Sequence, residues 1–384
     1  MSAFEFRTTP AIYVESGAAA RLGQILRKRY SQERVCLVTD RFLHESGLLD
    51  PALADLKANG WTVQVIDDVI ADPPEHIVLQ ATERARQART EIVVGLGGGS
   101  SMDVAKLLAV LLASDQPLQE MYGIDNVRGS RLPLVQIPTT AGTGSEVTPI
   151  SIVTTGETTK SGVVAPELYA DLAILDSELT LGLPPRITAA TGIDAMVHAI
   201  EAYTSRVLKN PLSDNLAKQA LCLIGGKLVH VCGNGKDAAA RQDILLGATL
   251  AGQAFANAPV GAVHALAYPI GGIFHVPHGL SNSLVLPHVL RFNAPAAAPL
   301  YAELAEVLIP GIQGDETSKT EAFINFMEQI AIDTGIERQL REVGIKESDL
   351  RRMAQEAMKQ TRLLGNNPRD VTEDDAFAIY SAAF

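Results

Sequence analysis

The strongest constraint on the fold is the contrast between the two halves of this 384-residue chain. In the first half, short runs rich in β-branched residues alternate with longer segments of helical periodicity, and such runs stop after residue 175. The strand-like runs are 35–39, 62–66, 92–96, 134–137 and 172–175, with helical patterns such as 74–90 and 102–113 between them. This alternation is typical of an α/β domain with a mainly parallel sheet, so we expect an N-terminal α/β domain and an all-α C-terminal domain.

The run Leu181-Gly182-Leu183-Pro184-Pro185 interrupts both periodicities and is typical of a connection. The chain is also longer than a common single domain of about 100–200 residues. We therefore predict two domains, 1–182 and 183–384.

Residues 244–290 contain no Asp, Glu, Lys or Arg, so a membrane span has to be considered. Four prolines interrupt this segment, and its histidines, Gln253 and Asn257 would be costly in lipid. Four of the eight histidines of the chain fall within it. We therefore expect buried helices around a polar site and no association with a membrane.

The formal net charge of −12 opposes binding to a phosphate backbone, so nucleic acid is not an expected partner. The three cysteines, Cys36, Cys222 and Cys232, form no CxxC pair, which indicates free and mostly buried thiols in a reducing compartment. The N-terminal residues show no basic region followed by an apolar stretch. The expected location is the cytoplasm.

A glycine-rich loop follows the strand-like run 92–96 and leads into a helical segment. It consists of Gly97, Gly98, Gly99 and Ser100. Glycines let backbone amides approach a pyrophosphate, and a helix N-terminus adds the positive end of its dipole. Because Ser100 replaces the last glycine of a strict GxGxxG pattern, a tight turn without a ligand is the alternative.

A second polar loop, at 139–146, also follows a strand and carries hydroxyl groups at Thr139, Thr140 and Thr143. Hydroxyls and exposed amides at the carboxyl edge of a parallel sheet suit the phosphates, ribose and carboxamide of a dinucleotide. Asp40, at the end of the first predicted strand, is placed either to accept hydrogen bonds from an adenosine ribose or to cap the next helix.

One carboxylate and three imidazoles form a candidate metal site. Asp194 and His198 are four residues apart in a helical pattern and therefore share one face, and His264 and His278 lie in the uncharged segment. Such a set would bind a divalent transition metal and leave a position for substrate or water. The alternatives are hydrogen-bonded core histidines, and an Asp194 that caps a turn beside Thr191.

Taken together, these motifs resemble the iron-containing (group III) alcohol dehydrogenases, whose fold is dehydroquinate-synthase-like. The resemblance rests on Gly97-Gly98-Gly99-Ser100-x-x-Asp103-x-x-Lys106, the loop 139–146, Thr191-Gly192-Ile193-Asp194-x-x-x-His198-Ala199-Ile200-Glu201, His264 and Pro277-His278-Gly279. It covers essentially the whole chain. It implies an α/β nucleotide-binding domain followed by a helical domain that binds metal and substrate.

The resemblance also implies a role for each matching residue. The metal ligands fall on the four residues that the spacing suggests, the phosphate loop on 97–100, and the substrate pocket on Phe255. Further contacts with the cofactor fall on Asp40, Asp103, Lys106, Thr139, Thr140 and Thr143. The implied cofactors are NAD and Fe²⁺, with Zn²⁺ as a competitor because of its intrinsic affinity.

The expected activity is hydride transfer between NAD(H) and a small alcohol or aldehyde, in a homodimer or larger homo-oligomer. Many family members carry a second histidine four residues after the third ligand. This sequence has Tyr268 at that position. Tyr268 and His275 are candidates for proton transfer; alternatively, Tyr268 fills space and His275 lies on the surface. Other readings of the whole chain are a maleylacetate-reductase-like enzyme, a hydroxyacid–oxoacid transhydrogenase, a dehydroquinate-synthase-like lyase and a non-enzymatic binding protein.

Overall fold

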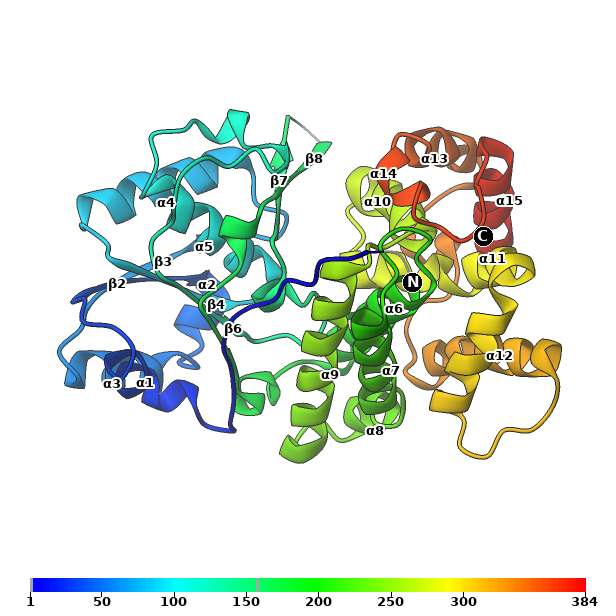
Figure 1. Cartoon of the computed structure of the whole chain (residues 1–384), viewed down its shortest axis with the longest axis horizontal. Helices are drawn as coiled ribbons and strands as arrows, with labels where there is room; N and C mark the ends of the chain where they lie inside the picture. The colour runs from blue at the N-terminus through cyan, green and yellow to red at the C-terminus, as the bar shows by residue number, and fades with distance from the viewer. Residues whose placement is uncertain (1–2, 157–158) are drawn as a thin grey trace. The chain divides into compact units, whose positions relative to one another are not determined.

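The computed structural model describes residues 3–156 and 159–384 (Figure 1). The chain divides into two compact units. An α/β unit comprises residues 8–140 and 144–182, and a helical unit comprises residues 141–143 and 183–384 together with the N-terminal residues up to Arg7.

The α/β unit is built on a six-stranded parallel sheet with the strand order β1-β9-β6-β4-β2-β3. Its strands are β1 (Ile12–Val14), β2 (Arg34–Asp40), β3 (Thr62–Val69), β4 (Ile92–Gly97), β6 (Leu134–Pro138) and β9 (Leu172–Leu175). All five predicted strands are confirmed as members of this sheet. The sequence did not predict β1, because three residues are too few to show a period of two.

Helices cover both faces of this sheet, since successive side chains of a strand point to opposite faces. Val35 and Leu37 of β2 pack with one set of helices, whereas Cys36 and Val38 pack with the other. The first set is α1 (Leu22–Arg27) and α3 (Asp50–Ala58), and the second is α4 (Glu75–Gln87) and α5 (Gly99–Leu111). The short α2 (Arg41–Glu45) follows β2 directly.

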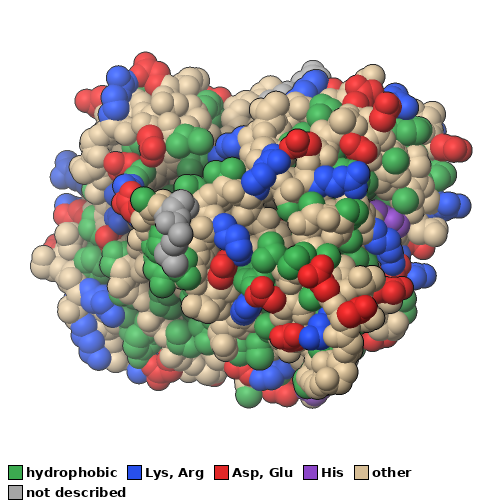
Figure 2. All heavy atoms as spheres, turned by 45° about the vertical axis from the view of Figure 1, so that its right-hand side comes forward, with side chains coloured by type: hydrophobic (Ala, Val, Ile, Leu, Met, Phe, Trp, Pro, Cys, Tyr) green, Lys and Arg blue, Asp and Glu red, His purple; other side chains and the backbone are tan. Residues whose placement is uncertain are grey.

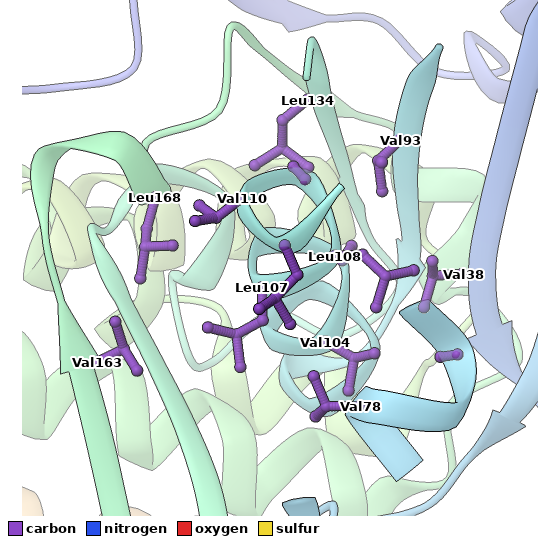
Figure 3. Close-up of a cluster of buried hydrophobic side chains, with 14 of the residues drawn as sticks. Val38, Val78, Val93, Val104, Leu107, Leu108, Val110, Leu134, Val163 and Leu168 are labelled. Carbon is purple, nitrogen blue, oxygen red and sulfur yellow. The ribbon is translucent and has the colours of Figure 1, made fainter. Parts of the chain in front are cut away.

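A second, three-stranded sheet was missed by the sequence analysis. It contains β5 (Gly123–Ile124), β7 (Ile150–Thr155) and β8 (Thr159–Val164), with β7 and β8 antiparallel. Its side chains Val153 and Val163 belong to the same buried cluster as Val104 and Leu108 of α5 (Figure 3). Helix α5 is therefore covered by the large sheet on one side and by the small sheet on another, which explains its near-complete burial.

The helical unit contains no strand among its described residues, as predicted. Its helices are α6 (Pro185–Thr204), α7 (Pro211–Gly225), α8 (Leu228–Gly233), α9 (Ala238–Asn257), α10 (Ala262–Phe274), α11 (His278–Leu308), α12 (Glu316–Asp333), α13 (Leu350–Ala357), α14 (Thr361–Leu364) and α15 (Glu373–Ala383). The uncharged segment 244–290 forms most of α9, all of α10 and the start of α11. Across the described chain, no helix combines the length and apolarity that a membrane span requires.

The distribution of surface charge and the exposure of the cysteines are two further features of the structure. On the face shown in Figure 2, basic and acidic side chains are intermixed. Cys36 is buried, but Cys222 is exposed and Cys232 is partly exposed. The expectation of mostly buried thiols was therefore wrong, because helix periodicity places Cys222 on the outer face of α7.

Candidate metal centre and nucleotide loop

Three helices of the helical unit carry the four predicted ligands. Asp194 and His198 lie one turn apart in α6, His264 lies in the first turn of α10, and His278 is the first residue of α11. Because α6 begins at Pro185, Asp194 lies in the helix interior, and the alternative of an aspartate capping a turn beside Thr191 was wrong. Asp194, His198 and His264 are buried.

The structure brings these four side chains together. One ligand atom from each lies within 4.8 Å of the others. Nε2 of His198 is 3.0 Å from Nε2 of His264, and Nε2 of His278 is 3.6 Å from Oδ1 of Asp194. Nitrogen and carboxylate donors converging at this spacing are the donor set that Zn²⁺ and Fe²⁺ accept in proteins.

The electrostatics of the cluster favour a bound cation. Burial lowers the pKa of His198 to about 3, so its ring is neutral near pH 7 and its lone pair is available. Burial alone would raise the pKa of Asp194, but the hydrogen bond from Asn282 and the surrounding histidines together hold that pKa below its ordinary value. Asp194 is therefore an anion, and its described neighbours at the cluster, Asn282, His198, His264 and His278, include no lysine or arginine.

One buried polar atom at the cluster, Oδ1 of Asn282, has no hydrogen-bond partner within the described residues. Most buried polar atoms in proteins are satisfied, and orphaned ones are concentrated at functional sites. The residues present therefore fit a divalent metal better than a set of core histidines that are satisfied by one another.

Gly279 explains how α11 approaches α6 closely enough to align His278 with Asp194. A Cβ atom at this position would collide with the backbone carbonyl of Ala190 and lie 3.3 Å from Cβ of Asp194. Only a residue without a side chain lets the two backbones meet here. The ligand His278 is thus followed directly by the glycine that lets its helix pack against α6.

We expect Gly279→Ala to destabilise the protein by about 1–3 kcal/mol, the usual cost of overpacking a core, and to weaken metal binding by displacing His278. The control is Gly233→Ala, because a Cβ on Gly233 meets nothing within 4 Å and that glycine ends α8. Urea unfolding and metal titration of both variants would test this. Equal stability and metal affinity in the two variants would contradict the packing argument.

Two residues at the cluster were not assigned a role from the sequence. Nδ2 of Asn282 donates to Oδ1 of Asp194 at 2.6 Å, and it lies 3.2 Å from Nε2 of His264. Oε2 of Glu201 lies 2.6 Å from Nδ1 of His264, and its hydrogen bond and charge raise the pKa of His264 against the opposing effect of burial. A helical signal existed for both, because Asn282 follows His278 by one turn and Glu201 follows His198 by three residues.

Aromatic side chains flank the cluster. The ring of Phe255 stacks on His198 with centroids 4.3 Å apart, and the ring of Tyr268 lies 6.3 Å from that of His278. Burial raises the pKa of Tyr268. His275 is exposed and ends α10 with a left-handed backbone, φ 56°, and the structure does not bring it into the cluster.

The glycine loop has the predicted strand–loop–helix geometry. Strand β4 ends at Gly97, Gly98 is the N-cap, and α5 begins at Gly99. A Cβ on Gly97 would lie 2.7 Å from Oγ of Ser101, so the loop is closed too tightly for a side chain. Ser100 is in the first turn of α5 and partly exposed, where a helix N-terminus favours an anion.

Asp40 ends β2, and its Oδ1 accepts a hydrogen bond from the backbone nitrogen of Leu43 at 2.9 Å. The prediction that Asp40 caps the next helix is therefore confirmed. A cap occupies one carboxylate oxygen, so capping and a role toward a ribose are compatible.

The threonines of the polar loop have different surroundings. Thr139 is buried, and its backbone nitrogen donates to the carbonyl of Gly97 at 2.9 Å, which ties this loop to the glycine loop. Thr140 is partly exposed and lies near Gly98. Thr143 is also partly exposed and belongs to the helical unit.

Asp103 and Lys106 are engaged inside the α/β unit. Lys106 is 0% exposed, and its Nζ donates to Oγ of Ser145 at 2.8 Å and to the carbonyl of Ile150 at 2.7 Å. Asp103 lies 3.6 Å from Nζ of Lys106 and accepts from Oγ of Ser145 at 2.6 Å and from the backbone nitrogen of Ile152 at 2.9 Å. The pair thus anchors the chain from Ser145 to Ile152 onto α5.

Two family models match the chain and together cover most of it. The model described as iron-containing alcohol dehydrogenase matches residues 9–177, and the model of the C-terminal part of that family matches residues 188–384. The chain belongs to the iron-containing alcohol dehydrogenase family. It is therefore an oxidoreductase of the alcohol dehydrogenase type, with the dehydroquinate-synthase-like fold that the resemblance implied.

Relatives along the full length of the chain agree with this assignment. Long-chain-alcohol dehydrogenase 1 of Geobacillus thermodenitrificans is 42% identical over 93% of this chain and 91% of the relative. The NAD-dependent methanol dehydrogenase of Bacillus methanolicus is 33% identical over 98% of this chain and 99% of the relative. The solved structure of a 1,3-propanediol oxidoreductase has a TM-score of 0.96, with 34% identity over 100% of both chains. These matches do not favour the lyase, maleylacetate reductase or transhydrogenase readings.

Proposed function

We propose that this member of the family oxidises small alcohols with NAD, and reduces the corresponding aldehydes, at a divalent metal held by Asp194, His198, His264 and His278. The observation that carries the proposal is the convergence of these four ligand atoms within 4.8 Å. A bound cation supplies electrophilic stabilisation of the negative charge that develops on the substrate oxygen as its proton leaves.

The protein's own side chains set the conditions for this chemistry. Neutral imidazoles and one carboxylate would leave positive charge on a divalent centre, which favours an anionic oxygen as a further ligand. Three of the four ligands are buried, which strengthens electrostatic interactions among them. Fe²⁺ is the expected metal for this family, and Zn²⁺ would compete for the same ligands.

For the cofactor, we propose that residues 1–182 bind the dinucleotide and that residues 183–384 bind metal and substrate. The amides of 97–100 would hold the pyrophosphate, and Thr139, Thr140 and Thr143 would contact the ribose and nicotinamide. Asp40 would accept a hydrogen bond from the 2′-hydroxyl of the adenosine ribose and repel a 2′-phosphate, which favours NAD over NADP. Asp103 and Lys106 would contribute to cofactor binding indirectly, by holding the segment from Ser145 to Ile152 in place.

For the substrate, the stacking of Phe255 on His198 places an apolar ring beside the ligands and supports a role in lining the alcohol pocket. Tyr268 lies beside His278 and is a proposed proton carrier; its raised pKa keeps the phenol protonated near neutral pH, so it would relay a proton through its hydroxyl group. His275 is a second proposed proton carrier, which is exposed and lies outside the cluster of ligands. A cytoplasmic location and a homodimer or larger homo-oligomer complete the proposal.

The test is to load the purified protein with Fe²⁺ under anaerobic conditions and to follow NADH absorbance with C2–C4 alcohols, diols and hydroxyacids. We expect NADH to form with alcohols, activity with NADP to be lower, and a chelator to remove the activity. Tight NADH binding without turnover of any alcohol or aldehyde would refute the proposal. Full activity after complete metal removal would refute the metal-dependent chemistry alone.

A further inference from the structure

Glu201 is a buried carboxylate with no role assigned by the proposed chemistry. It lies in α6, is 6% exposed, and uses both oxygens on α10. Oε1 accepts a hydrogen bond from the backbone nitrogen of Val263 at 2.7 Å, and Oε2 lies 2.6 Å from Nδ1 of His264. Among the described residues, His264 is the one ion-pair partner of Glu201 within 4 Å.

The start of α10 depends on side chains that are distant in sequence. Its N-cap residue is Gly261, which has no side chain to accept from the first amides of the helix. Glu201 accepts from the nitrogen of Val263, and Oδ1 of Asn367 accepts from that of Ala262 at 3.4 Å. The residue next to the capped amide of Val263 is the ligand His264, so the cap and the ligand are adjacent.

The second contact of Glu201 decides which ring nitrogen of His264 can bind a metal. An ionised carboxylate only accepts hydrogen bonds, so Nδ1 of His264 has to carry the hydrogen that lies between them. In the neutral ring, which is the form that binds a metal, the lone pair is then on Nε2, and Nε2 is the atom that faces His198 and Asp194. A carboxylate bonded to the remote nitrogen of a ligating histidine also makes that histidine a stronger donor.

We propose that Glu201 is a positioning residue of the metal centre, which fixes the start of α10 through Val263 and the tautomer of His264 through Nδ1. The inference rests on the proposed metal site. The same carboxylate therefore positions the backbone of α10 and makes His264 a stronger donor to the metal. Loss of the carboxylate should weaken metal binding even where the helix stays folded.

The variant Glu201→Gln tests this, because the amide NH2 group replaces one carboxylate oxygen and would meet a donor, either the nitrogen of Val263 or Nδ1 of His264. The probe is Co²⁺, titrated into metal-free protein by calorimetry, with its visible absorption spectrum as a second readout. We expect about a 10- to 100-fold loss of Co²⁺ affinity, as for other residues behind metal-bound histidines, and a changed Co²⁺ spectrum. Thermal unfolding of the metal-free proteins establishes that each variant is folded.

The control is Asn367→Ala, which removes the other side-chain acceptor at the start of α10, together with two hydrogen bonds to Asn293, and leaves the contact with His264 intact. It should keep wild-type Co²⁺ affinity and spectrum while losing some stability. Glu201→Asp serves if Glu201→Gln does not fold, and its shorter side chain should likewise lose Co²⁺ affinity.

Three outcomes would count against the proposed role of Glu201 or the metal site itself. Wild-type Co²⁺ affinity and spectrum in Glu201→Gln would overturn the inference while leaving the metal site in place. Equal losses in Glu201→Gln and Asn367→Ala would also overturn it, since the loss of affinity would then not require the contact with His264. A wild-type protein that binds no Co²⁺, Fe²⁺ or Zn²⁺ would instead refute the proposed metal site itself.

Discussion

Replacing Asp194 or His264 with alanine is expected to abolish metal binding and to reduce turnover at least about a thousandfold. Each substitution removes one of four converging donors, and the remaining three would hold the metal much less tightly. A metal ion contributes several kcal/mol of stabilisation to developing charge, and each 1.36 kcal/mol corresponds to about tenfold in rate. The loss should appear in kcat as well as in metal content measured by elemental analysis.

The affinity for NADH should change little in these variants, because the glycine loop belongs to the α/β unit. His230→Ala is the matched control, since His230 is an exposed histidine of the helical unit that pairs with Asp237. It should keep both metal and activity. A His264→Ala protein with full metal content and wild-type turnover would end the assignment of this cluster as the metal site.

Metal should also stabilise the wild-type fold by mass action, by about 2.7 kcal/mol at a free concentration 100 times the dissociation constant. The Asp194→Ala protein should show no such gain. Thermal unfolding of both proteins with and without metal would separate a lost ligand from a general loss of structure. An equal gain in both proteins would place the bound metal elsewhere.

Lys106→Met is expected to destabilise the protein by about 3–5 kcal/mol, because it leaves the largely buried Asp103 without its cation. Burial raises the pKa of Asp103 and lowers that of Lys106, so each charge depends on the other. The segment from Ser145 to Ile152 would lose its anchor on α5, and the affinity for NAD should fall with it. Urea unfolding and NADH fluorescence titration measure the two effects.

Two further variants isolate the ion pair. The double variant Lys106→Met with Asp103→Asn should be less destabilised than the sum of the single changes, since the second removes the stranded charge. Lys160→Met is the control, because Lys160 pairs with the exposed Asp72 and such surface pairs contribute about 0–1 kcal/mol. A Lys106→Met protein as stable as Lys160→Met would show that the buried pair adds no stability.

The sequence by itself determined the larger features of this protein. Each strand of the parallel sheet from β2 onward contains a short apolar run, and such a run is a property of neighbouring residues. The spacing of Asp194 and His198 places both on one face of a helix wherever that helix packs. His264 and His278 joined this set as imidazoles of the uncharged segment, and the resemblance of the long ordered motifs pointed to the same four residues and to the family.

The tertiary structure decided which remote groups complete each site. Lys106 follows the glycine loop and could be taken for a cofactor contact, but the small sheet encloses it, and that sheet was not visible in local periodicity. Glu201 lies in α6 like two of the ligands, yet its partner is 63 residues away in α10. Burial and hydrogen-bond partners arise from contacts between segments far apart in the chain, whereas periodicity reports only on neighbours within one segment.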